Sequence, residues 1–341
     1  MGLLGRLFGG KDAERAPQDP RLPSMVSRVL EMHARLRLAP RCEARLADAM
    51  GPAVEHITSL VAGVPRAHEA TIAAWSADPY VRAYFAAPDD IDQVLARSRA
   101  LHDYFEAQPG TDSAYAVLGM TMNERSTLGV ARVGDQTRSD VAQTTLGFSD
   151  HLIRLCGADE DGLREEVTQR MVDQIAVEGL AKVAADTTLR EDLEQERALL
   201  ASRLRLLERQ GTGLRGMVGS DEASAPGDLA RVRAEAEEIE QRLQALGPRS
   251  EVLSRQLDTL CEAFANAAEL LQVSIVQRRI DRMNVVVENG IGDMAESHLL
   301  EFRVARVPGN PPQQRTLAIL KVARKDMPRP ANLLDNADKF L

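Results

Sequence analysis

Aromatic residues, cysteines and long apolar runs are all scarce in this sequence, and each shortage excludes a class of protein. Aromatic residues make up 4% of the 341 residues, against 44% hydrophobic and 27% charged residues. This composition is typical of a folded chain and favours helices. No run of about 18 apolar residues is present, so the sequence predicts no membrane-spanning helix, and we expect no secretory signal peptide.

The few cysteines and histidines form no pattern of a metal site. Cys42, Cys156 and Cys261 are widely separated and include no Cys-x-x-Cys pair, which favours a reducing compartment. The six histidines form no HxxxH or HExxH motif, so we expect no metal and no other cofactor. The net charge of −9 disfavours nucleic acid as a partner. The expected location is the cytoplasm, with the inner face of the membrane as an alternative.

Catalytic motifs are equally scarce. A GxxxxGK pattern at residues 5–11 lacks both the following Ser or Thr and a preceding strand, so it does not predict a phosphate loop. Ser149, Asp150 and His151 are the residue types of a hydrolase triad, but consecutive side chains point in different directions and cannot relay a proton among themselves. The sequence therefore does not favour an enzyme, although it does not exclude one.

The strongest pattern is a heptad repeat of apolar residues. Strict three- and four-residue spacing over about six heptads places one apolar seam along a long helix, which must bury it against another helix. Ser250 interrupts the seam, and the adjacent Gly247 and Pro248 predict a break there. The seam residues expected to form a coiled coil are Leu229, Val232, Ile239, Leu243, Leu246, Leu253, Leu257, Leu260, Phe264 and Leu271.

A second helical pattern, from Leu163 to Leu207, supplies the partner of this seam. The Gly-, Ser- and Pro-rich segment 210–228 cannot continue either helix and predicts the tip of an antiparallel hairpin. Helices of about 45 residues would be about 70 Å long. Two interpretations are compatible with this pattern, namely a projecting hairpin arm and an ordinary helical bundle folded back on itself.

Strand patterns occur on both sides of the hairpin. Because short strands seldom stand alone, we predict an α+β fold, predominantly helical, with one small antiparallel sheet assembled from two sequence regions and a long antiparallel coiled-coil hairpin inserted between them. Two separate small β units are the alternative. The predicted strands are 114–122, 126–133, 140–148, 298–307 and 315–323, with turns at 123–125 and 134–136.

The predicted organisation follows from these patterns. Five prolines, Pro40, Pro52, Pro65, Pro79 and Pro88, are expected to divide the first helical domain into pieces of ordinary length. The predicted parts are an amphipathic tail with a Pro-rich linker (1–23), a helical domain (24–110), a β-containing body (111–158 plus 281–330), the helical hairpin (159–280, tip 210–228) and a C-terminal helix (331–341).

Three groups of residues are candidate binding sites. Leu3, Leu4, Leu7 and Phe8 fall on one face of a short helix and predict reversible membrane contact, with a plain tail as the alternative. Trp75 and Tyr84, together with Asp150 and His151, either line a ligand pocket or belong to the core of a small domain. The third group is a basic patch, which either contacts lipid headgroups, nucleic acid or the acidic hairpin arm, or forms ion pairs within the chain or is simply solvated. It comprises Arg303, Arg306, Lys321, Arg324 and Lys325.

Two functional hypotheses follow from the sequence. The first is a non-enzymatic scaffold protein whose coiled-coil hairpin binds a protein partner or a second copy of the chain as a homo-oligomer. The second is a ligand-sensing regulatory domain with a pocket between the sheet and the aromatic helical domain.

Overall fold

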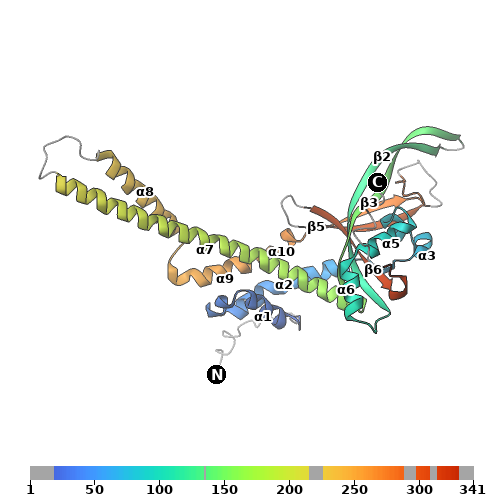
Figure 1. The fold of residues 1–341 in the computed structure, drawn as a ribbon, viewed down its shortest axis with the longest axis horizontal. Coiled ribbons are helices and arrows are strands. Elements are labelled where there is room, and N and C mark those ends of the chain that lie inside the picture. The colour runs from blue at the N-terminus through green and yellow to red at the C-terminus, as the bar shows by residue number, and fades with distance from the viewer. Residues whose placement is uncertain (1–18, 134–135, 215–225, 288–296, 308–312, 330–341) are drawn as a thin grey trace, which may run out of the picture. The chain divides into compact units, whose positions relative to one another are not determined.

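A computed structural model describes residues 19–133, 136–214, 226–287, 297–307 and 313–329 (Figure 1). It is a mixed α+β fold in which a long antiparallel helical hairpin is inserted, in sequence, between two groups of strands that form one sheet. This confirms the predicted fold class. The helices are α1 (Leu22–Met32), η1 (Ala34–Leu38), α2 (Cys42–Ala62), α3 (Ile72–Ala77), α4 (Pro79–Tyr84), α5 (Pro88–Arg97), α6 (Arg99–Ala107), α7 (Glu160–Leu214), α8 (Pro226–Ala245), η2 (Arg249–Glu251), α9 (Val252–Ala265), α10 (Ala267–Leu270) and η4 (Arg324–Asp326). The strands are β1 (His68–Glu69), β2 (Ser113–Val133), β3 (Gln136–Gly157), β4 (Val273–Ile280), β5 (His298–Val307) and β6 (Gln313–Ala323).

The chain forms two compact units. Unit 1 comprises Met1–Ala53 and Asp173–Asn266, and unit 2 comprises Val54–Val172 and Ala267–Leu341, each to the extent that its residues are described. The predicted helical domain at 24–110 is thus divided between the two units.

Unit 1 is built around residues 173–214 of α7, a helix of 55 residues whose first turns belong to unit 2. The second arm of the hairpin, which runs back along α7, is interrupted. Helix α8 ends at Ala245, Gly247 has a φ of +73°, and α9 begins at Val252. The break predicted at Gly247 and Pro248 is therefore confirmed. Figure 1 shows α8 beside the far end of α7 and α9 beside its middle. Near the break, Leu257 and Leu260 are fully buried in this helical unit.

A buried glycine lets α9 approach α7 closely. A Cβ atom on Gly179 would lie 2.9 Å from Leu260 Cδ1 and 3.0 Å from the Cβ of Ala263. Glycine is a weak helix former, but within a long helix its cost of about 1 kcal/mol is offset by the packing that a bare backbone allows.

One proline prediction is wrong. Helix α2 continues through Pro52, whereas the sequence indicated that this proline divides the helix. The preceding residue is Gly51, which has no Cβ to clash with the proline ring, so the usual restriction before proline is relaxed. The other prolines behave as expected, because Pro79 and Pro88 each begin a helix.

In unit 2 the strands form one six-stranded sheet with the order β3-β2-β6-β5-β4, and β1 pairs with β6. All neighbouring pairs are antiparallel except β1 and β6. The turn predicted at 123–125 is wrong, because these residues continue β2 and pair with Thr145, Leu146 and Gly147 of β3. The hairpin range predicted to reach residue 280 is also too long, because its last eight residues form β4.

Beyond Met120, β2 pairs with β3 alone, and the two strands continue as a two-stranded ribbon (Figure 1). A turn after β4 returns to the base of this ribbon: Leu146 N donates to Asn284 O at 2.8 Å, and Val286 N donates to Thr144 O at 2.7 Å. Arg278 of β4 also pairs with Glu124 of the ribbon at 2.7 Å. The two ends of the sheet are thereby connected through backbone hydrogen bonds.

The core of unit 2 lies between the sheet and helices α3–α6. It combines small residues of β2 with aromatic rings of the helical segment and of β5, such as Tyr84, Phe85, Phe105 and Phe302. Most of the scarce aromatic side chains in this region therefore serve packing.

At the C-terminal ends of three helices, an arginine from another segment binds carbonyl groups in the last turn or just beyond it. The guanidinium of Arg164 donates to the carbonyl of Val61 in the last turn of α2 and to those of Val64 and Pro65 just beyond it, at 2.6–2.9 Å. Arg324 similarly binds the carbonyls of residues that follow α6 and lies over the Phe105 ring at 4.7 Å. Arg190 binds Leu246 O and Gly247 O beyond α8. A cation there satisfies unpaired carbonyls and opposes the helix dipole.

Candidate functional site

Three of the four residues predicted to line a pocket meet around the end of α4. His151 Nε2 lies 2.7 Å from Tyr84 O, and its ring stacks on Phe85 at 5.2 Å. Trp75 Nε1 donates to Phe85 O at 2.8 Å. His151 thereby holds the Tyr84–Phe85 segment against β3, and Trp75 connects it to α3.

The fourth residue, Asp150, turns elsewhere. Its φ of +52° and the register shift near Met120 mark a β-bulge in β3, so Asp150 and His151 do not follow the regular alternation of a strand. Asp150 Oδ2 accepts from Thr121 Oγ1 at 3.2 Å, and its carbonyl accepts from Arg315. Asp150 and His151 are therefore not a proton-transfer pair.

Tyr84 is buried in an aromatic cluster. Its ring meets Phe148 and Phe302 edge-on, with centroids 5.5 and 6.1 Å apart. Burial raises the pKa of its hydroxyl far above the ordinary value. Nearby, His68 Nδ1 lies 2.6 Å from Asp78 Oδ2; burial opposes ionisation of Asp78, but the hydrogen bond from His68 keeps the pKa of this carboxyl below its usual value.

A cavity of about 260 Å³ lies beside this cluster, lined by neighbours of the predicted residues. Its apolar part includes the buried Ala83 and Leu146, and its exposed part includes Arg125. We call it the ribbon pocket, because most of its lining belongs to the base of the β2–β3 ribbon. It is lined by Ala83, Ala86, Asn123, Arg125, Thr145, Leu146, Gly147, Phe148, Ser149 and Asn284.

Hydrogen bonds fix the polar side chains of the ribbon pocket. Asn123 Nδ2 donates to Ser149 Oγ at 2.8 Å across the ribbon. Asp281 holds the turn that carries Asn284 by accepting from the amides of Met283 and Val285, at 2.8 and 2.9 Å. Sequence reasoning missed these residues, because only the ribbon and the turn after β4 bring them together. The one sequence feature that pointed toward the pocket was that part of its lining, residues 145–149, immediately precedes the predicted residues Asp150 and His151.

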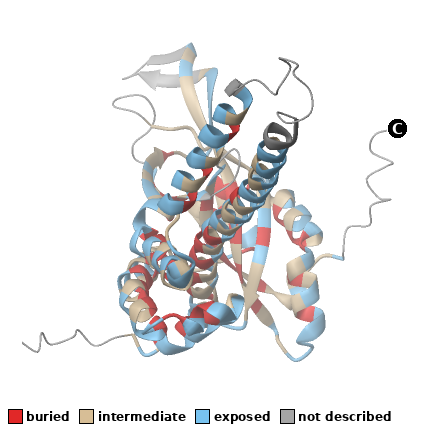
Figure 2. Ribbon diagram, turned by 90° about the vertical axis from the view of Figure 1, so that its left-hand side faces the viewer, coloured by how far each residue is buried: buried red, intermediate tan, exposed pale blue. Residues whose placement is uncertain are grey.

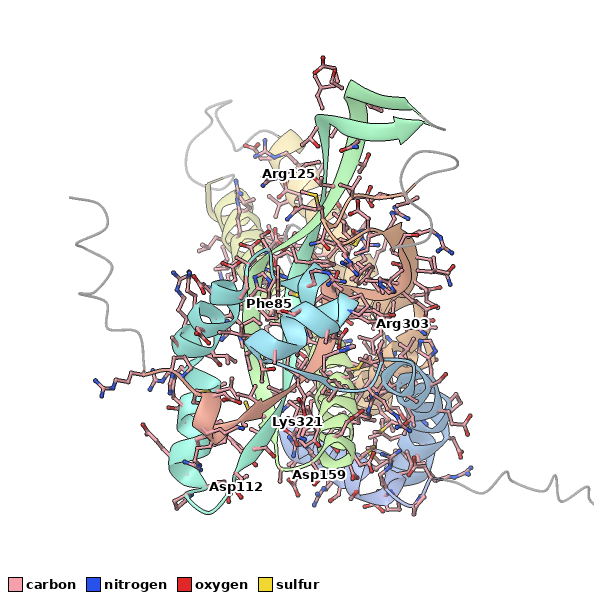
Figure 3. All side chains as sticks on the ribbon, turned by 90° about the vertical axis from the view of Figure 1, so that its right-hand side faces the viewer. Phe85, Asp112, Arg125, Asp159, Arg303 and Lys321 are labelled. Carbon is pink, nitrogen blue, oxygen red and sulfur yellow. The ribbon has the colours of Figure 1, made fainter. Side chains whose placement is uncertain are left out.

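The predicted basic patch is largely used within the chain. Arg303 pairs with Glu301 at 2.6 Å, and Lys321 lies 3.7 Å from Glu69. Arg324 is engaged at the end of α6, as described above. Lys321, Arg324 and Lys325 line one cavity of about 560 Å³ together with three carboxylates, whereas Arg303 and Arg306 are not part of its lining. Figure 3 shows Lys321 near Asp112 and away from Arg303.

The coiled-coil seam separates into a buried and a marginal part. Val232, Ile239 and Leu243 of α8 are buried, and the last two pack with Leu193 of α7. Leu229, Leu246 and Leu253 are half-buried. Among the remaining seam residues, Leu257, Leu260 and Phe264 are buried on α9, whereas Leu271 lies beyond α10 and belongs to unit 2.

A second stripe with heptad spacing runs along the outer side of α7. Its six residues, which we call the outer stripe, are spaced by three and four positions and are all exposed. Three are leucines with exposures of 41%, 71% and 59%. Figure 2 shows how much of this end of α7 and α8 is exposed. The outer stripe consists of Leu189, Asp192, Glu196, Leu199, Arg203 and Leu206.

Chemical groups for catalysis are few in the part of the chain that the structure describes. There, no group of three or more His, Cys, Asp and Glu side chains is placed to hold a metal ion. Burial raises the pKa of Cys156 to about 12 and that of Cys261 to about 11, so neither thiol is a ready nucleophile at neutral pH.

Membrane contact is a separate question. No helix among the described residues combines the length and the apolar character needed to cross a bilayer. Leu3, Leu4, Leu7 and Phe8, as well as the C-terminal helix predicted at 331–341, lie outside the described residues.

Comparison with protein-family models, with curated proteins and with solved structures found no match.

Proposed function

We propose that this protein is a non-enzymatic association protein, in which the outer stripe of α7 binds the same stripe of a second copy in antiparallel orientation. The observation that supports this proposal is the stripe itself. The inner seam of the hairpin is already buried between α7 and α8, so it is not available to a partner. The leucines of the outer stripe remain 41%, 71% and 59% exposed in the single chain, so each has surface left to bury against a partner.

The order of residues in the outer stripe suits antiparallel pairing of two copies. In such a coiled coil, facing positions add to a constant residue number. When the two-fold axis of the antiparallel pair passes between residues 197 and 198, Leu189 faces Leu206 of the second copy, and Asp192 faces Arg203. Each ion pair occurs twice by symmetry. A parallel, in-register pair of the two helices would instead place Asp192 against Asp192 and Arg203 against Arg203. Such like-charge contacts are unfavourable.

Charges at these positions select the orientation, and the leucines supply apolar area. Burying a leucine contributes about 1.5–3 kcal/mol. An exposed ion pair adds less than about 1 kcal/mol, so the charges contribute mainly specificity. The alternative proposal, a ligand-sensing domain, is supported by the ribbon pocket.

Charge reversal tests the proposal in the full chain. Sedimentation velocity should show a dimer of the wild type that Arg203→Asp weakens about tenfold or more, because two attractive contacts become repulsive. The double variant Asp192→Arg, Arg203→Asp exchanges the charges and should restore the dimer. Arg205→Asp, an exposed charge outside the stripe, is the matched control and should change little.

The leucines give a second readout. Leu199→Ser with Leu206→Ser should abolish the dimer while leaving the helix content unchanged, because both side chains are exposed in the single chain. A wild-type chain that stays monomeric over the accessible concentration range would overturn the proposal. Equal effects of Arg203→Asp and Arg205→Asp would reject the antiparallel register.

A further inference from the structure

We infer that the ribbon pocket is a binding site for a small carboxylate that carries a hydroxyl or amino group on the adjacent carbon. Its lining includes an arginine that forms no ion pair among the described residues, a serine hydroxyl, and a buried asparagine carbonyl oxygen that no described donor reaches, around an apolar floor. The inference does not depend on self-association, because the pocket lies in unit 2 and the outer stripe lies in unit 1.

The cation is Arg125, on the β2 side of the pocket, where Figure 3 shows it above Phe85. No carboxylate lies within ion-pair distance of its guanidinium among the described residues, and the neighbouring Glu124 pairs with Arg278 instead. The guanidinium fork of an arginine matches the geometry of a carboxylate, and such pairs are frequently bidentate. Ser149 accepts a hydrogen bond from Asn123, so its own hydroxyl proton remains available to the same anion.

The acceptor is Asn284. Its Nδ2 donates to Arg82 O at 3.1 Å, which fixes the orientation of the amide because a carbonyl accepts only from the nitrogen. Its Oδ1 is buried, and within the described chain no donor lies within hydrogen-bond distance of it. A buried acceptor without a donor is costly. A ligand hydroxyl or ammonium group would satisfy it.

The size of the pocket limits the ligand. About 260 Å³ is below the range of about 300–1,000 Å³ that is typical for drug-sized ligands. Gly147 keeps this volume open, because a Cβ atom at its position would meet nothing within 4 Å. Ala83 and Ala86 contribute only methyl groups to the lining. The apolar floor suits a short aliphatic chain on the ligand.

Three probes with the same carbon skeleton test the inference, namely propionate, L-lactate and L-alanine. Saturation-transfer NMR on the full chain should detect L-lactate or L-alanine at millimolar concentrations, with at least about fivefold tighter binding than propionate. This factor is what one hydrogen bond to a buried acceptor is worth. At ten times its dissociation constant, the better probe should also raise the melting midpoint by about 2–4 °C.

Two variants locate the site. Arg125→Gln should weaken binding about tenfold or more, and Gly147→Val should abolish it by filling the pocket. Their controls are Arg99→Gln, which changes an arginine with a side-chain exposure of 92% on α6, and Gly110→Val, which adds a side chain into open space away from the pocket. Arg125 is exposed, so its variant is expected to fold even where Gly147→Val does not.

Each result of the binding experiments either supports or overturns the inference. Binding that prefers L-lactate or L-alanine over propionate, and that is lost in Arg125→Gln but not in Arg99→Gln, supports the inference. Equal binding of all three probes, binding that both arginine variants leave unchanged, or no binding of any probe would overturn it. None of these results bears on the dimer, which sedimentation measures independently.

Discussion

The two units of this protein are stabilised in different ways. Unit 1 consists of helices whose contacts repeat along the chain, such as the packing of Leu193 on Ile239 and Leu243. Unit 2 depends on contacts between residues far apart in sequence, such as the pairing of β2 with β6 and the binding of Arg164 to the end of α2. Periodic local patterns therefore determine unit 1, whereas unit 2 requires particular long-range pairs.

This difference also concerns the candidate sites. The outer stripe is a one-dimensional pattern on one helix. The ribbon pocket combines residues of β2, β3, the end of α4 and the turn after β4. Variants that destabilise one unit and leave the stability of the other unchanged would support this difference. Variants that destabilise both units equally would contradict it.

The largest effect is expected from Phe302→Ala. Phe302 is 1% exposed, and its ring lies among those of Tyr80, Tyr84 and Phe148. Removing it should lower the free energy of unfolding of unit 2 by about 3–5 kcal/mol. The single tryptophan, Trp75, lies in unit 2, so its fluorescence during urea unfolding reports on that unit. Leu243→Ala is the counterpart in unit 1 and should leave the tryptophan transition unchanged.

The next effect is expected from Gly179→Val. A side chain here clashes with Leu260 and Ala263, so α9 should move away from α7 at a cost of about 1–3 kcal/mol. Circular dichroism during urea unfolding should show an earlier loss of helix, without a change in Trp75 fluorescence. Ala181→Val, at an exposed position of the same helix, is the control. A coincident shift of both signals would show that the two units unfold together.

A somewhat smaller effect is expected from Arg164→Met. The variant leaves the carbonyls of Val61, Val64 and Pro65 without their donor, and we expect a loss of about 2 kcal/mol in unit 2. The midpoint of the Trp75 transition measures it. Arg170→Met removes an exposed arginine that pairs with Glu166 on the same helix, and it should cost much less.

The smallest effect concerns pH. Burial would raise the pKa of Glu160, but hydrogen bonds from Arg164 and the Ala67 amide lower it below its ordinary value. Because the folded-state pKa is depressed, its contribution to stability is present above the unfolded-state pKa, near about 4.3, and is lost as the pH falls through the folded-state value. Glu160→Gln should therefore destabilise unit 2 at pH 7 and approach the wild type in stability at acidic pH. A pH-independent difference would contradict this assignment.

The helical part of the fold could be predicted because its information is local. The heptad spacing from Leu229 indicated the hairpin, and Gly247 with Pro248 indicated the break, since helix periodicity and backbone limits act over a few residues. The sequence also indicated both strand regions. It placed a turn at 123–125 because polar residues there resemble a hairpin signal, yet pairing with β3 keeps that segment extended.

The long-range contacts were determined only by the tertiary structure. Local patterns do not show that Arg324 binds the end of α6, that Asn284 returns to β3, or that a bulge at Asp150 directs His151 toward Tyr84. Composition and spacing determine which segments are helices and strands and which of their faces must be buried. The partner of each buried polar group depends on which distant segments meet, because a hydrogen bond requires an exact position that hydrophobic burial does not.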